Sequence, residues 1–385
     1  MKLFVGIDVS SKDLVTSMIS EGNHEVVFQG NFVNDLKGAT ELKNVIINTA
    51  NSNHLGQIII GMEATSIYSF HPAMFFQEDS DLKKLNTQSV VIDPKKTKRY
   101  HDVFAEDKND QIDALQRLTR SRYELVQSLV RAKQHFIENL YYKLNELVIS
   151  DELNTSVFGS TMMSLLTEDM TTDDLLNISL SDLTAYLTEH GRGRFANPEA
   201  LAKTIQKAVR SSYRLDKVVA NSVDTVLSVY AEEIKAFQKM IKDLDKAIEK
   251  IVKVIDEEQI LRSIPGIGPV YAAGILAEIG QIERFDNEAK LAKYAGLSWK
   301  EKQSGNYASD NTPLKRTGNA YLRYYLVEAA NRVRIQDPVF GEYYQRKYKE
   351  VKRTPSKRAL VLTARKLVRV IFFLLKNHQI YQEKR

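Results

Sequence analysis

Leu3–Ser11 reads LFVGIDVSS, a short apolar run that is interrupted by an aspartate. Such a run predicts a β-strand that is buried on both faces. Open α/β sheets bind their ligands at the carboxyl ends of such strands, so Asp8 is the first candidate for chemistry. A strand-end aspartate also commonly starts a turn or caps a helix, and that alternative stays open for Asp8 alone.

The composition describes a folded protein of 385 residues, which is long enough for two or three domains. The chain has no cysteine, which excludes disulfides, thiol catalysis and cysteine-ligated zinc. Its seven histidines are scattered, and none pair at the spacing of a helical metal site. The amino terminus lacks a signal-peptide pattern, and charges interrupt the apolar segment 359–375. We therefore expect a cytoplasmic protein without a membrane partner.

The charge is distributed unevenly along the chain. Residues 251–385 contain 25 Lys and Arg against 14 Asp and Glu, a net charge of +11, whereas the first 250 residues carry −6. A basic carboxyl-terminal part is typical of a protein that binds a polyanion. A solvated basic surface without a ligand is the alternative interpretation.

The amino-terminal third has the pattern of an α/β domain. Segments 13–20, 24–33, 57–63 and 84–93 read as further strands, and Asp35 is placed to cap a helix over residues 35–51. Thr65 or Ser66 can cap a second helix. The strand 57–63 also ends on an acid, Glu63.

A second pair of acids, Asp110 and Asp113, opens the next predicted helix at a spacing that puts both on one face. Stabilisation of the helix dipole is the alternative role for this pair. If the four acids converge, two carboxylates about 4 Å apart repel by roughly 4 kcal/mol at an effective dielectric of about 20. Cations would relieve that repulsion, and ligands that are all oxygen favour Mg²⁺ or Mn²⁺. Two such ions can clamp a phosphodiester during in-line displacement.

The middle of the chain reads as helical. Residues 125–147 predict a long helix, and residues 151–230 a helical insertion with starts near Thr171 and Ser179. Seven apolar residues then repeat with heptad spacing, which predicts a coiled coil within the chain or between protomers: Ile234, Phe237, Ile241, Leu244, Ile248, Ile251 and Ile255.

Two carboxyl-terminal segments suit binding of a nucleic-acid backbone. The glycine turn at Gly266 and Gly268 precedes an alanine-rich helix, like a helix-hairpin-helix motif whose N–H groups approach phosphates. Beyond it, Ser304 lies near five cations suited to bind phosphate: Lys300, Lys302, Lys315, Arg316 and Arg323. Asn319 is a further candidate for contact with nucleic acid. From these residues alone Ser304 is an ordinary loop serine. Tyrosines among the basic residues of the tail suit either base stacking or a helical core.

The order of these motifs resembles the insertion sequence 110 family of transposases. GIDVS at residues 6–10, MEAT at 62–65 and DQIDA at 110–114 are similar to the family's DEDD pattern, although Asn109 and Ser66 depart from the usual residues. Asp110 is preferred to Asp107 because it keeps the spacing to Asp113. PGIG at 265–268, YAGL at 294–297, Ser304-Gly305 and KRTGNAYLR at 315–323 resemble the family's carboxyl-terminal transposase domain.

The resemblance implies three parts: an RNase H-like (RuvC-like) DEDD domain over residues 1–125, a helical linker with coiled coil over 126–258, and a mainly α serine-bearing transposase domain over 259–385. Asp8, Glu63, Asp110 and Asp113 would hold Mg²⁺ or Mn²⁺, and Ser304 of a second subunit would attack DNA. It further implies donor and target DNA, a noncoding guide RNA, homodimers that assemble into a homotetramer, and the nucleoid of a bacterium or archaeon.

Three alternatives remain. A junction resolvase would hydrolyse DNA with the acids alone. A sugar-kinase-like phosphotransferase would share the Gly6-Ile7-Asp8 turn, but the sequence lacks the second glycine-rich phosphate loop. A nucleic-acid-binding scaffold would be catalytically inactive.

Overall fold

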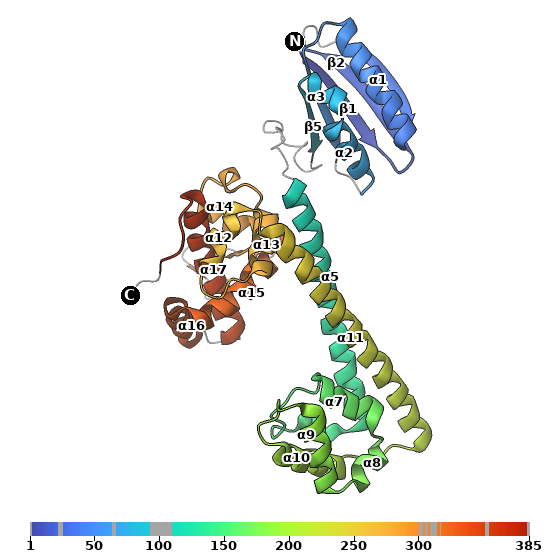
Figure 1. Cartoon of the computed structure of the whole chain (residues 1–385). Coiled ribbons are helices and arrows are strands. Elements are labelled where there is room, and N and C mark those ends of the chain that lie inside the picture. The colour runs from blue at the N-terminus through green and yellow to red at the C-terminus, as the bar shows by residue number, and fades with distance from the viewer. Residues whose placement is uncertain are drawn as a thin grey trace. The chain divides into compact units, whose positions relative to one another are not determined.

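A computed structural model describes residues 2–21, 26–63, 67–92, 110–299, 303–304, 307–308, 314–315, 317–350 and 354–382. The chain divides into two compact units, residues 1–109 and 110–385, which are considered separately (Figure 1). Among the described helices, none is long and apolar enough to cross a membrane.

The amino-terminal unit contains a mixed sheet of five strands: β1 (Lys2–Val9), β2 (Asp13–Ser20), β3 (Val26–Val33), β4 (Gln57–Glu63) and β5 (Thr87–Ile92). The strand order is β3-β2-β1-β4-β5. The first three strands form an antiparallel meander, whereas β4 and β5 run parallel to β1. This sheet with its helices is compatible with the expected RNase H-like domain.

Three helices connect these strands: α1 (Leu36–Ser52), α2 (Phe70–Glu78) and α3 (Ser80–Lys84), with a 3₁₀ turn η1 (Ile67–Ser69) before α2. Asp35 caps α1 as predicted, because its Oδ1 accepts a hydrogen bond of 2.7 Å from the Gly38 N–H. The last strand begins at Thr87, three residues later than predicted, because α3 continues to Lys84.

The two faces of the sheet differ. Leu3, Val5, Ile7 and Val9 of β1 are at most 5% exposed and belong to one core with apolar residues of α1 and α2. The alternate positions Phe4, Gly6 and Asp8 are exposed. The prediction that β1 is buried on both faces is therefore wrong: its side chains alternate between the core and an open face that carries Asp8.

The second unit is organised around two long helices, α5 (Asp110–Lys143) and α11 (Lys217–Val252). The Arg122–Asp245 ion pair joins them at 2.5 Å and the Lys143–Asp224 pair at 2.9 Å. The later position on α5 meets the earlier position on α11, so the helices are antiparallel. The predicted heptad residues Ile234, Ile241 and Ile248 are buried, but the helix ends at Val252, before Ile255.

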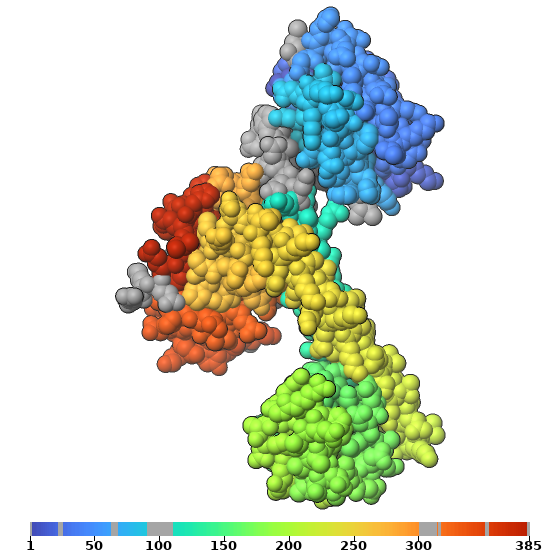
Figure 2. All heavy atoms as spheres, viewed as in Figure 1, coloured from blue at the N-terminus to red at the C-terminus, as the bar shows by residue number. Residues whose placement is uncertain are grey.

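Between these helices lie α6 (Asn145–Ile149), α7 (Ser160–Ser164), a π-helical turn η2 (Leu165–Asp169), α8 (Thr172–Asn177), α9 (Leu180–Gly191) and α10 (Pro198–Ser211). Thr171 and Ser179 cap α8 and α9, which confirms both predicted helix starts. Figure 2 shows this segment, in green, as a compact lobe. Its apolar residues form a core of their own with α5 and α11.

In the described residues after α11, the helical segments are α12 (Asp256–Arg262), α13 (Pro269–Ile279), η3 (Ile282–Arg284), α14 (Glu288–Tyr294), α15 (Ala320–Gln336), α16 (Pro338–Glu350) and α17 (Pro355–Lys376). Between α14 and α15 the described residues include short strands of two residues: β6 (Ser298–Trp299), β7 (Gln303–Ser304), β8 (Tyr307–Ala308) and β9 (Leu314–Lys315).

The centre of this part is packed closely. The Tyr325 side chain of α15 is fully buried, and a Cβ on Gly274 of α13 would lie 2.4 Å from its ring. Leu115 from the start of α5 belongs to the same core. The second and third turns of α5 are therefore built into the carboxyl-terminal core. The predicted domain boundaries at residues 125 and 258 remain predictions.

Candidate active site

Asp8 and Glu63 stand at the carboxyl ends of two neighbouring parallel strands. The β1–β4 register pairs Ile7 with Met62, so the next residues along the two strands are Asp8 and Glu63. Ligand sites of α/β sheets form at this edge. Asp8 is exposed on the open face, whereas the Glu63 side chain lies outside the described part of the structure.

The open face of the sheet is hollowed beside Asp8. The hollow has a volume of about 830 Å³, and its lining includes Gly6, Asp8, Ser17, Asn31 and Gly61. Gly6 and Gly61 lie opposite each other in the register and present no side chain to this face. A polymer backbone could therefore approach the sheet closely next to the carboxylate.

The second pair of acids belongs to the other unit. Asp110 is the first residue of α5. Asp113 lies three residues later in the same helix and is half-buried. No three His, Asp or Glu side chains gather into a metal site within the described ranges, which leave out the side chains of Glu63 and Asp110. Whether Asp8, Glu63, Asp110 and Asp113 form one site stays a prediction. Their all-carboxylate donor set fits a hard divalent ion.

Ser304 is the last residue of β7. Its backbone pairs with Tyr307 across a connection of two residues, so Ser304 occupies a hairpin end rather than an irregular loop. The segments before and after this hairpin pair with each other in a second ladder, in which Ser298 pairs with Lys315 and Trp299 with Leu314. We call residues 297–318 the serine loop. The side chains of Ser304 and Lys315, and all of Lys302 and Arg316, lie outside the described residues.

In the glycine turn before α13, packing within the protein explains why one of the two glycines is required. Gly266 has a φ of +94°, and a Cβ there would lie 2.9 Å from backbone atoms of Arg332 and Val333 in α15. Gly268 is different, because its added Cβ would meet nothing within 4 Å. It forms the N-cap of α13 without a capping side chain. Phosphate contact by either glycine stays a prediction.

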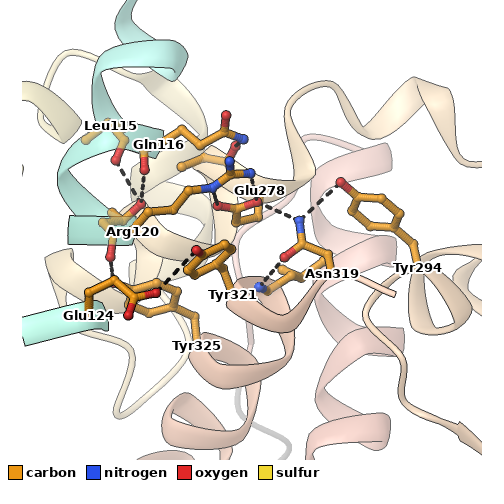
Figure 3. Close-up of polar contacts among 12 residues, drawn as sticks. Leu115, Gln116, Arg120, Glu124, Glu278, Tyr294, Asn319, Tyr321 and Tyr325 are labelled. Atoms are coloured by element: carbon orange, nitrogen blue, oxygen red, sulfur yellow. Dashed lines mark hydrogen bonds and ion pairs between the residues drawn. The ribbon is translucent and has the colours of Figure 1, made fainter. Parts of the chain in front are cut away.

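Asn319 and Arg323 contact the protein itself. Asn319 caps α15, since its Oδ1 accepts from the Leu322 N–H at 2.9 Å, and its Nδ2 donates to Glu278 Oε2 at 2.6 Å (Figure 3). Arg323 donates to the Ala295 carbonyl at 3.3 Å. These contacts give both residues a structural role, and their predicted contact with nucleic acid remains untested.

Glu278 is the residue that the sequence analysis missed. It is buried in α13, and Arg120 of α5 donates to its two oxygens at 2.8 and 2.9 Å (Figure 3). These hydrogen bonds raise the pKa of Arg120, against the opposing effect of burial. The Arg120 side chain is 40% exposed, so solvent screens this pair, and removal of one partner should cost less than the roughly 3–5 kcal/mol typical of a fully buried pair. A lone glutamate in the apolar run AAGILAEIG is the signal that sequence reading could have used.

A second hollow, of about 450 Å³, adjoins the end of the serine loop. Its lining includes Arg284, Lys290, Lys293, Tyr294 and Gly318. The Arg284 guanidinium lies 5.2 Å from the centres of the rings of Phe285 and Tyr294. Cations next to aromatic rings suit both phosphate and bases of a nucleic acid.

Comparisons with known proteins place two family models on the chain. A DEDD transposase model of IS110 matches residues 5–116, and a model of the transposase IS116/IS110/IS902 family matches residues 258–345. The IS116 uncharacterized 44.8 kDa protein of Streptomyces clavuligerus is 25% identical over 56% of this chain and 53% of its own length. The IS900 uncharacterized 42 kDa protein of Mycobacterium paratuberculosis is 26% identical over 77% of this chain and 73% of its own length.

A pilin gene-inverting protein of Moraxella bovis is 24% identical over 46% of this chain and 57% of its own length. The chain thus aligns with about half of the length of two of these three relatives.

Proposed function

This chain belongs to the IS110 family of transposases, and on that premise we propose that it cuts and rejoins DNA for a mobile element. Asp8, Glu63, Asp110 and Asp113 bind divalent metal, and Ser304 is the nucleophile. The observation that carries the proposal is the register of β1 and β4, which puts Asp8 and Glu63 side by side at the ligand-binding edge of the sheet. The match of the DEDD model to residues 5–116 supports it.

The four acids supply only carboxylate oxygens, which suits Mg²⁺ or Mn²⁺. When bound, such ions stabilise the charge that develops on the phosphate during in-line displacement. Asp8, on the open face beside Gly6 and Gly61, orients the DNA backbone over the sheet. Asp110 and Asp113 of α5 complete the set of acids.

Ser304 attacks the scissile phosphorus through its Oγ. The Oγ–P bond forms while one P–O ester bond breaks, the serine proton is lost to solvent or a base, and the leaving sugar oxygen takes up a proton. The phosphodiester energy is kept in the serine linkage, so attack by a sugar hydroxyl of another strand rejoins DNA without ATP. The position of Ser304 at the end of β7 supports this role, because functional residues are often found where strands meet their connecting segments.

The basic carboxyl-terminal part would hold the DNA. Its net charge of +11 from residue 251 onward supports electrostatic binding. The hollow lined by Arg284, Lys290, Lys293 and Tyr294 adjoins the serine loop and would receive the strand next to the cleaved phosphate. Gly268 at the start of α13 leaves room for a second phosphate.

We further propose the partners that the family resemblance implies. These are donor and target DNA, a noncoding guide RNA, and homodimers that assemble into a homotetramer in which Ser304 reaches the acids of another subunit. Four strands must be cut when two duplexes recombine, which requires four nucleophiles. The name of the pilin gene-inverting relative supports recombination between DNA sites.

The test is a reaction of purified protein with DNA carrying the element's ends and RNA transcribed from its flanking noncoding region. We expect strand exchange in Mg²⁺ or Mn²⁺, loss of exchange in chelator, and a protein–DNA species that survives denaturation. Cleavage to free ends without that species would favour a hydrolytic resolvase. DNA binding without any cleavage in either metal would favour an inactive scaffold.

A further inference from the structure

We propose that Asn319 and Glu278 are positioning residues that fix the serine loop to α5, the helix that carries Asp110 and Asp113. The proposal rests on the proposed function. Its structural part, the attachment of the loop to the helix, can be tested without any reaction. The argument starts from the root of the loop, where the chain enters and leaves it.

The two ends of the serine loop are fastened to each other. The Asn319 N–H donates to the Tyr294 carbonyl at 2.7 Å, which joins the residue after the loop to the residues before it. Gly318 makes this approach possible, because a Cβ there would lie 2.4 Å from the same carbonyl oxygen and its φ is +132°. The β6–β9 ladder extends the closure into the loop.

The Asn319 side chain connects this root to a buried carboxylate. Its Nδ2 donates to Glu278 Oε2 at 2.6 Å and lies 3.2 Å from the Tyr294 hydroxyl. The Glu278 side chain is 0% exposed. Asn319 therefore does three things at once: it caps α15, closes the loop and binds α13.

The same carboxylate binds α5. Arg120 makes a two-pronged contact with Glu278, and Gln116, one turn earlier, donates to the Ala277 carbonyl at 3.2 Å. The Arg120 guanidinium carbon lies 4.9 Å from the centre of the Tyr321 ring. The Tyr321 hydroxyl donates to Glu124 at 3.4 Å (Figure 3). Glu278 thus connects the root of the serine loop to Arg120, and its neighbours Ala277 and Tyr321 add contacts to the turns of α5 before and after it.

The helix transmits this attachment to the acids. Asp113 and Arg120 are seven residues apart within α5, which puts them on one helix face about 10 Å apart along the axis. An uninterrupted helix over two turns is stiff, so the root of the serine loop and Asp113 of one chain keep a fixed separation. Since Ser304 of one subunit meets the acids of another, this separation sets where each chain presents its nucleophile relative to its own acids. A buried polar cluster with all its partners satisfied specifies geometry more than it adds stability. Displacement of reacting groups by about 1 Å can slow a reaction about 100-fold.

Asn319→Asp is the informative substitution. The aspartate keeps the size of the side chain and the cap of α15, but it places a carboxylate where the amide donated to Glu278. The two carboxylates repel each other, and they do so beside Arg120, which contacts Glu278, and Tyr294, which contacts residue 319. Combining it with Glu278→Gln restores one donor and one acceptor between positions 278 and 319 with their direction reversed. Because Arg120 then keeps one acceptor on residue 278 instead of two, partial recovery is the expected result. Asn197→Asp is the matched control, because Asn197 caps α10 without a carboxylate partner among its contacts.

The structural measurement uses the absence of cysteine from the chain. Cysteines introduced at Gln134 of α5 and Thr317 of the loop root, both exposed positions, take nitroxide labels in the full-length protein. We expect a narrow distance distribution between the labels in the parent and in Asn197→Asp, a broadened or shifted one in Asn319→Asp, and partial recovery in Glu278→Gln/Asn319→Asp. An unchanged distribution in Asn319→Asp would overturn the proposal.

The functional measurement uses the same variants, without labels, and follows the rate of covalent DNA attachment alongside DNA affinity. We expect Asn319→Asp to slow attachment about tenfold or more, with affinity changed less than the rate, and the double variant to recover in part. Attachment at the parental rate in a variant whose label distances have changed would also refute the positioning role. If the parent itself attaches no DNA, the proposed function fails, whereas the label distances still decide whether the loop is held.

Discussion

Ser304→Ala should abolish covalent attachment of DNA to the protein and with it strand exchange. Removing the nucleophile of a covalent mechanism commonly costs about 10⁴-fold or more in rate, because neither metal binding nor DNA binding replaces the missing bond. DNA affinity should remain within a small factor of the parent, since a single hydroxyl adds little to a contact dominated by phosphate charge. The measurement is a denaturing gel of labelled DNA after reaction in Mg²⁺.

Ser222→Ala is the matched control for that experiment. Ser222 is exposed on α11, and its hydroxyl bonds only to a carbonyl of its own helix among its described contacts. It should react like the parent. If Ser304→Ala cleaves DNA at the parental rate, the acids act by hydrolysis and the serine has no part in the chemistry.

Asp8→Asn should remove cleavage in either metal while DNA stays bound. The substitution keeps the shape of the side chain but removes the negative charge that a divalent ion requires, and the loss of several kcal/mol of transition-state stabilisation corresponds to about 10³-fold or more in rate. The parent in chelator should behave in the same way. Strand cleavage and DNA affinity are measured side by side.

Glu41→Gln removes a carboxylate from the same unit but from α1, which packs on the other face of the sheet. Glu41 is exposed and lies 3.9 Å from the still more exposed Lys37, a contact of little energetic value. This variant should cleave normally. Parental activity in Asp8→Asn would remove Asp8 from the catalytic set.

Local patterns predicted much of the amino-terminal unit. The strand 13–20, the cap at Asp35 and the strand 57–63 follow from alternation and capping chemistry, which depend on neighbours in sequence. The burial of β1 did not follow. An unbroken apolar run does not reveal that Phe4 and Asp8 face an open side, because that depends on which helices cover the sheet.

Contacts between distant residues were beyond the sequence. Arg120 and Glu278 are 158 residues apart in the sequence, and Glu278 and Asn319 are 41 residues apart. No local sequence pattern indicates that these three residues meet. The consequence is a different interpretation of the motif Lys315-x-x-Gly318-Asn319. Sequence alone favoured nucleic-acid binding for Asn319, whereas its contacts explain the Gly-Asn pair by closure of the serine loop. Gly266 is explained in the same way by its approach to α15.

The most direct test of the central claim is to identify the residue that carries DNA in the trapped protein–DNA species. The species formed by the full-length protein in Mg²⁺ is digested with nuclease and protease, and the nucleotide-bearing peptide is sequenced by mass spectrometry. The account predicts a phosphodiester on Ser304, formed only when Asp8 is intact. A nucleotide on any other residue, or a linkage to Ser304 that forms equally well in Asp8→Asn, would contradict it.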